Sequence, residues 1–167
     1  MSPRNPLTEL FATFPRPRCY IASPLGFTEA GRDYYARYLQ ALVEHVDPVD
    51  PWTLTEPEEF AAAAAQDRVH AFGIEVGARN AAAIFSSHML IAQLDGQEVD
   101  AGTAAEVGYA AALGLPCVGI RSDLRASGEP GMHVNLQLEA FIVLSGGFIA
   151  TSLDELVGRL AALRTGA

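Results

Sequence analysis

One continuous apolar run, residues 89–94 (MLIAQL), constrains the fold of this chain more than any other feature of its sequence. An apolar run without polar alternation is typical of a strand that is buried on both faces of a parallel sheet. An acidic, glycine-containing loop follows it, then a helical stretch over 103–113 and a second apolar run over 116–120. A strand, a helix and a strand in this order predict a parallel β-α-β unit.

The rest of the chain continues this alternation and predicts an α/β fold. We expect a doubly wound, Rossmann-like or flavodoxin-like, mostly parallel five-stranded sheet with helices on both faces. Such sheets bind ligands at the carboxyl ends of their strands, where the loops 23–27 and 95–102 are expected. The other expected strands are 18–22 and 140–144, and the other expected helices are 28–46, 58–72, 77–85, 134–139 and 152–163.

The length of 167 residues fits one domain. Residues 1–17 contain several prolines and no clear periodicity, so we expect an N-terminal arm or extended lead-in. Residues 18–167 are expected to form the single domain.

Charge and hydropathy exclude several classes of function. The net charge is −9, which argues against binding of nucleic acid through phosphate contacts. All eleven basic residues are arginine, so a Schiff-base or P-loop lysine is excluded. No apolar run reaches the roughly 18 residues that span a bilayer, and the first residues do not resemble a signal peptide. We therefore expect a cytoplasmic protein with no membrane partner.

The segment L-D-G-Q-E-V-D-A-G-T-A-A-E-V-G-Y-A (94–110) carries the clearest chemical signal. It places Asp95, Asp100 and Glu106 around one strand end, and Gly102 lets a ligand approach the backbone closely. A carboxylate at a helix N-terminus stays ionised, which suits a nucleophile. The alternative is structural: Thr103 and Glu106 fit a capping box, and the two aspartates fit loop caps. The spacing alone leaves both interpretations open.

Six segments in order resemble the nucleoside 2-deoxyribosyltransferase family. The resemblance implies an enzyme that passes a 2-deoxyribosyl group from one nucleobase to another by double displacement, without a cofactor. The segments are Y-I-A-S-P-L-G-F-T-E-A-G-R (20–32), D-P-W (50–52), R-N-A-A-A-I (79–84), the 94–110 segment, G-L-P-C-V-G-I-R-S-D-L-R (114–125) and V-N-L-Q-L-E (134–139).

The resemblance also implies roles for individual residues. Glu106 matches the nucleophilic glutamate, Asp100 the aspartate that holds the sugar, and Tyr20 the tyrosine that orients the nucleophile and crowds the 2′ position. Asn135 matches an asparagine that a neighbouring subunit supplies to bind the 5′ side of the sugar. The expected protein is therefore a homo-oligomer that binds 2′-deoxynucleosides and free nucleobases.

We expect five further residues to contact the substrate, and two of them have an alternative structural role. Asp95, Gly102 and Gln137 are assigned to substrate binding in the matched segments. Trp52 and Phe27 are candidates for contact with the base, and packing in a loop or the core is the alternative for both.

One departure from the family concerns the start of the central strand. The family commonly has an aspartate that faces the base there, whereas this chain has Ser87-His88. We expect His88 to take over the contact with the base, since an imidazole can donate a hydrogen bond to a ring nitrogen. The alternative is a strand-start residue with an ordinary hydrogen bond.

Two other functions remain as alternatives. One is a hydrolase of 2′-deoxynucleoside 5′-monophosphates, and the other is a non-catalytic nucleotide-binding module. No metal site is expected, because the sequence has neither CxxC nor HExxH and its four histidines lie far apart.

Overall fold

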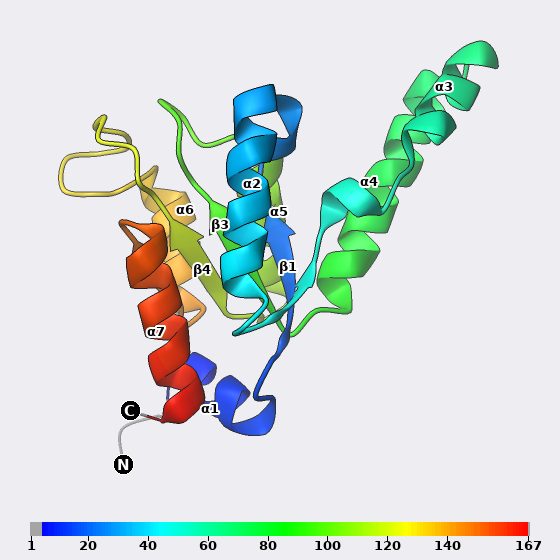
Figure 1. Cartoon of the computed structure of the whole chain (residues 1–167). Helices are drawn as coiled ribbons and strands as arrows, with labels where there is room; N and C mark the ends of the chain where they lie inside the picture. Colours follow the sequence, from blue (N-terminus) through cyan, green and yellow to red (C-terminus); the bar gives the residue numbers. More distant parts are fainter. Residues whose placement is uncertain (1–4, 167) are drawn as a thin grey trace.

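The computed structural model describes residues 5–166, which form a parallel sheet with helices on both faces (Figure 1). The five strands pair in the order β2-β1-β3-β4-β5, and every neighbouring pair is parallel. The predicted doubly wound α/β fold is therefore confirmed. The strands are β1 (Arg18–Ala22), β2 (Asp47–Val49), β3 (Met89–Gln93), β4 (Cys117–Ile120) and β5 (Ile149–Ala150).

The centre of the sheet is the pair β1 and β3. The apolar run predicted as a buried strand forms β3, and every residue of that strand is buried. Tyr20 of β1 pairs with Leu90 of β3. From β1 the chain passes to β2 on one side of β1 and then returns to form β3 on the other side of β1. Between β1 and β3 the chain order therefore reverses, which is where sheets of this kind bind ligands.

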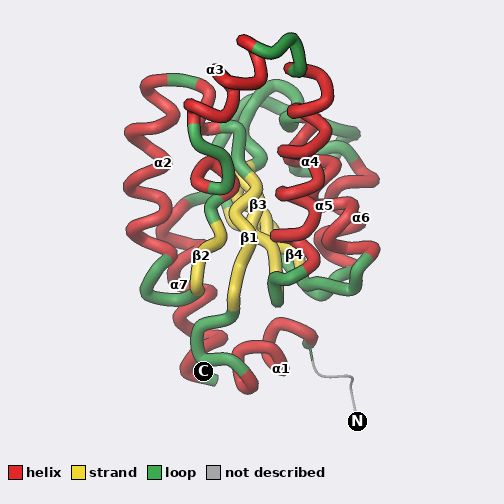
Figure 2. Tube along the Cα trace, turned by 90° about the vertical axis from the view of Figure 1, so that its right-hand side faces the viewer, coloured by secondary structure: helices red, strands yellow, loops and turns green. Residues whose placement is uncertain are grey.

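Helices cover each face of the sheet, as Figure 2 shows. Side chains of β1 alternate between the two faces, because successive residues of a strand point in opposite directions. Ile21 joins the core of one face, and Tyr20 and Ala22 join that of the other. On the first face lie α1 (Pro6–Thr13), α2 (Glu29–Leu42) and α7 (Leu153–Thr165), and on the second lie α4 (Val69–Phe85), α5 (Ala101–Ala112) and α6 (Leu136–Leu144).

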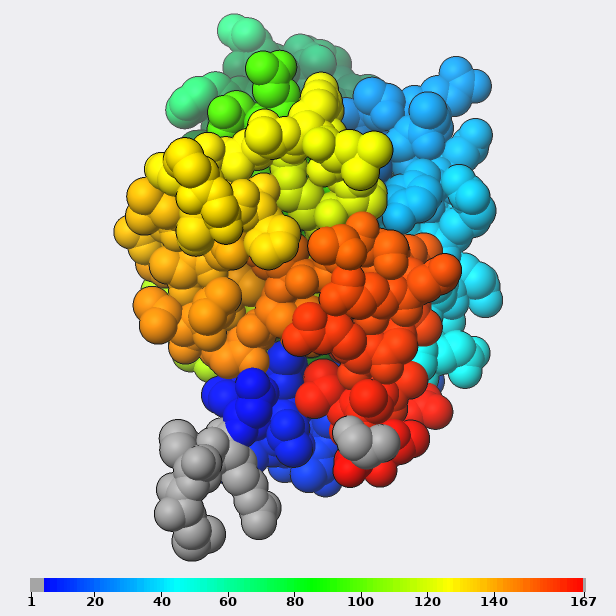
Figure 3. Space-filling view, turned by 90° about the vertical axis from the view of Figure 1, so that its left-hand side faces the viewer, coloured from blue at the N-terminus to red at the C-terminus, as the bar shows by residue number. Residues whose placement is uncertain are grey.

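Helix α1 corrects the expectation of an extended lead-in before residue 18. Asn5 caps the helix by accepting a hydrogen bond from the Leu7 amide, and Pro6 occupies the first turn, where proline is tolerated. Leu7 and Phe11 are buried in the core. In Figure 3 this helix lies against the C-terminal end of α7. Residues 1–4 of the expected arm lie outside the described residues.

Helices α3 (Pro57–Ala65) and α4 form a pair that extends away from the sheet (Figure 1). We predicted the break between these helices after residue 72, but it lies at 66–68, where Asp67 has a φ of 53°. Gly73 and Gly77 lie inside α4. A glycine within a helix costs only about 1 kcal/mol relative to alanine, so these two do not end it.

Helix α6 corrects the strand that we predicted over 140–144. Its sequence, LQLEAFIVL, is apolar around most of the helix, so the run FIVL resembles a strand. Asn135 caps the helix, and Leu138 and Ile142, four residues apart, are its buried residues. The fifth strand is the short β5, which pairs with β4. No helix within residues 5–166 combines the length and the apolar character required to cross a membrane.

The burial of α1 predicts that its aromatic anchor stabilises the domain. Phe11→Ala should lower the free energy of unfolding by about 3–5 kcal/mol, because it deletes a buried ring and leaves a cavity. Urea denaturation measures the loss. Phe14→Ala is the matched control, since that ring is 38% exposed, and its loss should be clearly smaller. Equal losses for the two variants would contradict this packing.

Candidate active site

A cavity of about 300 Å³ lies at the carboxyl ends of β1 and β3. The loops after β1, β2 and β3 and the first turns of α5 form one part of its wall, and the α3–α4 pair forms the rest. No described residue that lines it is basic. The lining residues are Ser23, Phe27, Pro51, Trp52, Thr55, Phe60, Val76, Asn80, Asp100, Gly102, Thr103 and Glu106.

A partly buried hydrogen bond joins Tyr20 of β1 to Glu106 of α5. The Tyr20 hydroxyl donates to Oε1 of Glu106 over 2.6 Å. Burial and the neighbouring Glu106 charge raise the pKa of the Tyr20 phenol, so the hydroxyl remains a donor at neutral pH. The hydrogen bond therefore fixes one oxygen of the Glu106 carboxylate.

Glu106 lines the cavity, and its second oxygen, Oε2, has no hydrogen-bond partner among residues 5–166. Burial raises the pKa of Glu106, the Tyr20 hydrogen bond lowers it, and the nearby Asp100 charge raises it. The net direction is upward, so the ionised form that we expected from a helix terminus is opposed by desolvation. A partly desolvated carboxylate with one free oxygen is suited to nucleophilic attack.

The cap of α5 decides between the two interpretations of its acidic residues. The helix begins at Ala101 with Asp100 as its N-cap, and Asp100 Oδ2 accepts from the Thr103 amide over 2.9 Å. Glu106 therefore lies in the second turn and bonds to Tyr20, so the capping box predicted for Thr103 and Glu106 is wrong. Asp100 does cap the helix, and it also lines the cavity.

Gly102 lies beside this cap. A Cβ at that position would stand 3.1 Å from Asp100 Oδ2, so the glycine keeps the cavity open next to the carboxylate.

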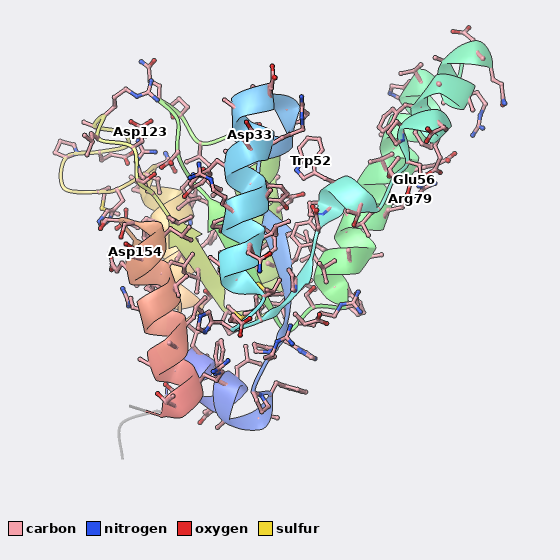
Figure 4. All side chains as sticks on the ribbon, in the orientation of Figure 1. Asp33, Trp52, Glu56, Arg79, Asp123 and Asp154 are labelled. Atoms are coloured by element: carbon pink, nitrogen blue, oxygen red, sulfur yellow. The ribbon has the colours of Figure 1, made fainter. Side chains whose placement is uncertain are left out.

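Two aromatic residues form another part of the wall. Trp52 and Phe27 meet edge to face with ring centroids 4.7 Å apart, and both line the cavity. Figure 4 shows Trp52 between α2 and the α3–α4 pair. The Trp52 indole donates to the Ser23 carbonyl over 3.2 Å. A Cβ on Gly26 would lie only 2.3 Å from the indole, so glycine is required for this contact.

Asp50 positions Trp52 from the other side. Asp50 is the N-cap of the short 3-10 helix η2 (Pro51–Thr53). Its Oδ1 accepts a hydrogen bond from the Trp52 amide over 3.0 Å. The same oxygen accepts from the Tyr35 hydroxyl of α2 over 2.8 Å. Burial raises the pKa of Tyr35, so this hydroxyl also remains a donor. The sequence analysis assigned no role to Tyr35 and did not find this contact.

The α3–α4 pair brings residues to the cavity that sequence reasoning missed. Phe60 comes from α3, and Val76 and Asn80 lie one turn apart on α4. An ion pair ties the two helices together, with Arg79 Nη2 and Glu59 Oε2 2.7 Å apart. The segment 79–84, which contains Asn80, resembles the family, but the sequence analysis assigned no role to its residues. The spacing of Val76 and Asn80 is a signal that could have suggested a shared face.

Asp95 lies outside the cavity lining, although we expected it to bind substrate. Its Oδ2 accepts from the Ser122 hydroxyl over 2.6 Å and from the Gln93 amide over 2.7 Å. Its Oδ1 accepts from the backbone amides of Ser122 and Asp123. These bonds fasten the loop after β3 to the loop after β4, which identifies Asp95 as a structural anchor in this conformation.

His88 also lies away from the cavity. It immediately precedes β3, so it lies at the amino end of the sheet, opposite the end that carries Glu106. Its ring stacks on Phe14 at 4.1 Å, and its Nδ1 accepts from the Arg18 amide over 3.0 Å. Contact between His88 and a base in the cavity is incompatible with this position, and the alternative of an ordinary hydrogen bond at the strand start holds.

Asn135 and Gln137 lie at the start of α6, and neither lines the cavity of its own chain. Asn135 Oδ1 accepts from the Gln137 amide as the helix cap. Both residues are exposed.

The described residues contain no group of three or more His, Cys, Asp and Glu side chains arranged to hold a metal ion.

Comparisons with known proteins agree with the fold. The 2-deoxyribosyltransferase of Bacillus psychrosaccharolyticus has a TM-score of 0.65 and 19% identity, over 86% of this chain and 95% of that one. A conserved protein from Enterococcus faecalis V583 has a TM-score of 0.61 and 23% identity, over 87% and 98%. No curated protein sequence matches. The sequence model described as "Nucleoside 2-deoxyribosyltransferase" matches residues 19–141, so this chain belongs to that family.

Proposed function

We propose that this protein transfers a 2-deoxyribosyl group between nucleobases through a covalent intermediate on Glu106. The observation that carries the proposal is the Glu106 carboxylate, held by Tyr20 through one oxygen and facing a cavity with the other. Family membership supports an enzyme of the deoxyribosyltransferase and N-glycosidase type.

The proposed reaction has two displacements at C1′ of the sugar. Glu106 attacks C1′, a C1′–O bond forms, and the electron pair of the C1′–N bond leaves with the first base. A nitrogen of the second base then attacks C1′ from the opposite side, and the C1′–O bond breaks and restores the carboxylate. The second base loses its N–H proton, which balances the proton that the first base takes up on leaving. Two inversions give net retention, as in a retaining glycosidase.

The remaining cavity residues fit the parts of a nucleoside. Asp100 uses Oδ2 for the helix cap, and its Oδ1 has no partner within residues 5–166, so it is available for a sugar hydroxyl. Tyr20 lies against the nucleophile and limits space at the 2′ position. Trp52 and Phe27 provide aromatic surface for the base, since a flat heterocycle stacks well on such rings. No cofactor is needed for these steps.

The alternative of hydrolysing 2′-deoxynucleoside 5′-monophosphates requires a phosphate cradle. Ser23 and Leu25 are already bonded to each other, since the serine Oγ accepts from the leucine amide over 3.2 Å. Pro24, between them, has no N–H to offer. Together with the absence of basic side chains among the described lining residues, this favours a nucleoside over its monophosphate.

We further propose that the protein is a homo-oligomer in which Asn135 and Gln137 reach the cavity of a neighbouring copy. Around α6 the surface is unusually apolar, because Leu136, Val143 and Leu144 are exposed there. A surface of this kind is typical of a protein interface. The cytoplasmic location expected from the sequence remains a prediction.

A transfer assay tests the reaction. The protein is incubated with 2′-deoxyinosine and adenine, and separately with thymidine and adenine, and the products are separated by chromatography. We expect 2′-deoxyadenosine from at least one donor. Glu106→Ala should lower its rate of formation by about a thousandfold or more, because the nucleophile is lost.

Glu98→Ala is the matched control, since Glu98 is an exposed glutamate in the loop before α5. It should leave the rate unchanged. Release of free base without a new nucleoside would contradict transfer and favour hydrolysis, and the monophosphates would then be the substrates to compare. Absence of any reaction would contradict both.

The pH dependence of transfer tests the Tyr20 contact. The ionised Glu106 is the reactive form and its pKa is raised, so kcat/KM should fall as the pH drops through a value above the ordinary 4.5. Tyr20→Phe removes the hydrogen bond that lowers this pKa, so the acid limb should move to higher pH. Tyr35→Phe, which loses a hydroxyl bonded to Asp50 instead, should leave the limb in place. An unchanged limb in Tyr20→Phe would contradict the assignment.

A mixing experiment tests the shared site. Glu106→Ala and Asn135→Ala should each show reduced activity. Refolding the two together in equal amounts should restore activity, because about a quarter of the sites would then combine an intact Glu106 with an intact Asn135 from another copy. Activity no greater than the average of the separate variants would contradict a shared site.

A further inference from the structure

We propose that Tyr35 is a positioning residue for nucleoside binding: through Asp50, its hydroxyl holds Trp52 in the orientation in which the indole lines the cavity. This inference rests on the proposed function for the meaning of the cavity, and it extends that function to a residue outside the cavity. Trp52 lines the cavity, whereas Tyr35 and Asp50 do not. Each of these two residues therefore acts through the side chain or backbone that it holds.

One carboxylate oxygen joins the two aromatic residues. Asp50 Oδ1 accepts a hydrogen bond from the Tyr35 hydroxyl over 2.8 Å and from the Trp52 backbone amide over 3.0 Å. The Asp50 carbonyl accepts a further hydrogen bond from the Thr53 hydroxyl over 2.9 Å. The short helix η2, which contains Trp52, therefore begins at a residue that is itself bonded to α2.

Helix α2 gives this connection a rigid end. Tyr35 is 6% exposed, belongs to the core of the first face of the sheet, and stacks near Tyr38 with ring centroids 6.2 Å apart. A tyrosine side chain has only two torsions, so packing of the ring also fixes the position of its hydroxyl. Burial and the Asp50 charge raise the pKa of the Tyr35 phenol, which therefore donates at neutral pH. The core of the domain thereby determines where the Asp50 carboxylate lies.

The segment that contains Trp52 is weakly held by its own structure. Helix η2 has three residues, and hydrogen bonds in 3-10 helices have poor geometry. Trp52 is 38% exposed and Phe27 beside it is 72% exposed, so core packing does not fix this pair. The hydrogen bond from the indole to the Ser23 carbonyl restrains the ring. The hydrogen bond to Asp50 restrains the backbone of the same residue.

Loss of the Tyr35 hydroxyl should therefore weaken binding and leave the chemical step unchanged. The Asp50 side chain would then be free to turn away, and Trp52 would occupy its orientation in the cavity for a smaller fraction of the time. The apparent affinity of a ligand falls in proportion to the fraction of protein in the competent conformation. The Tyr20–Glu106 hydrogen bond is separate from this connection, so a bound nucleoside would meet the same nucleophile.

The first measurement needs no substrate. Trp52 is the only tryptophan in the chain, so selectively excited tryptophan fluorescence reports on this residue alone. Acrylamide quenching measures the access of solvent to the indole. In Tyr35→Phe we expect a quenching constant about twofold larger or more, because the segment opens more often. Tyr34→Phe is the matched control, since Tyr34 precedes Tyr35 on α2 and packs beside Tyr38, and it should leave quenching unchanged.

The second measurement is the affinity for a nucleoside. Binding of 2′-deoxyinosine and of thymidine is followed by the same fluorescence in a Glu106→Ala background, which prevents turnover. We expect Tyr35→Phe to weaken the binding of at least one of them by about five- to twentyfold. In the protein with an intact Glu106, Tyr35→Phe should raise KM by a similar factor and keep kcat within about twofold.

Variants of Asp50 test whether Tyr35 acts through this carboxylate. Asp50→Ala removes both hydrogen bonds and should weaken binding at least as much as Tyr35→Phe. Adding Tyr35→Phe to Asp50→Ala should weaken it by no more than a further factor of about two. Asp50→Asn keeps an accepting oxygen and should bind within about twofold of the parent. The Asp50 charge also raises the pKa of Tyr20, so the comparison of kcat uses Tyr35→Phe, which keeps that charge.

Four results would overturn the inference: equal quenching in Tyr35→Phe and the parent, equal affinity in the two, effects of Tyr35→Phe and Asp50→Ala that multiply in the double variant, or no binding of either nucleoside. The proposed function fails separately, through the absence of transfer by the protein with an intact Glu106. Stronger quenching and weaker binding in Tyr35→Phe without transfer by the parent would retain the role of Tyr35 and reject the reaction.

Discussion

The hydrogen bond between Tyr20 and Glu106 is the contact on which the arrangement of the site depends. It joins β1 to α5, the helix that follows the neighbouring strand β3. The contact exists only because β1 and β3 are paired side by side, with Tyr20 opposite Leu90 and its side chain turned towards α5. The fully buried tyrosine fixes one oxygen of the glutamate, while burial makes that carboxylate harder to ionise. The order of the strands thereby determines where the most reactive group of the cavity lies.

The parts of the fold that were predictable are those in which local pattern and tertiary environment agree. The strand at 89–93 is apolar throughout and buried on both faces, and the last helix begins at the predicted cap, Ser152. The segment from Asp100 to Glu106 was predictable as a site because glycine and carboxylates follow a buried strand there. The helix over 140–144 was not predictable from the sequence, because FIVL favours a strand locally. The segment is helical because Leu138 and Ile142 pack on the sheet.

Residues of the candidate site were predictable where they belong to a sequence motif. They were not predictable where only tertiary packing brings them to the cavity. Tyr20, Asp100 and Glu106 lie close together, as the resemblance implies. Asp95 instead accepts hydrogen bonds from the loop after β4, and His88 lies at the opposite end of the sheet. The sequence already placed His88 at the start of the central strand, and the start of a parallel strand lies at the edge of the sheet opposite the carboxyl ends that bind ligands. Asn80 lies in the 79–84 segment that resembles the family, but its place in the cavity wall follows from the packing of α4 and not from that segment alone.

The projecting α3–α4 pair divides the cavity between two stretches of the chain. The carboxylates come from residues 100–106 on the body of the sheet, whereas Phe60, Val76 and Asn80 come from a hairpin of helices held together by Arg79 and Glu59. The carboxylates and this part of the cavity wall thus come from separate stretches of the chain. Insertions, deletions or substitutions confined to the hairpin would change the shape of the pocket and leave Glu106 in place. The range of substrates could therefore change in this fold while the reacting group stays the same.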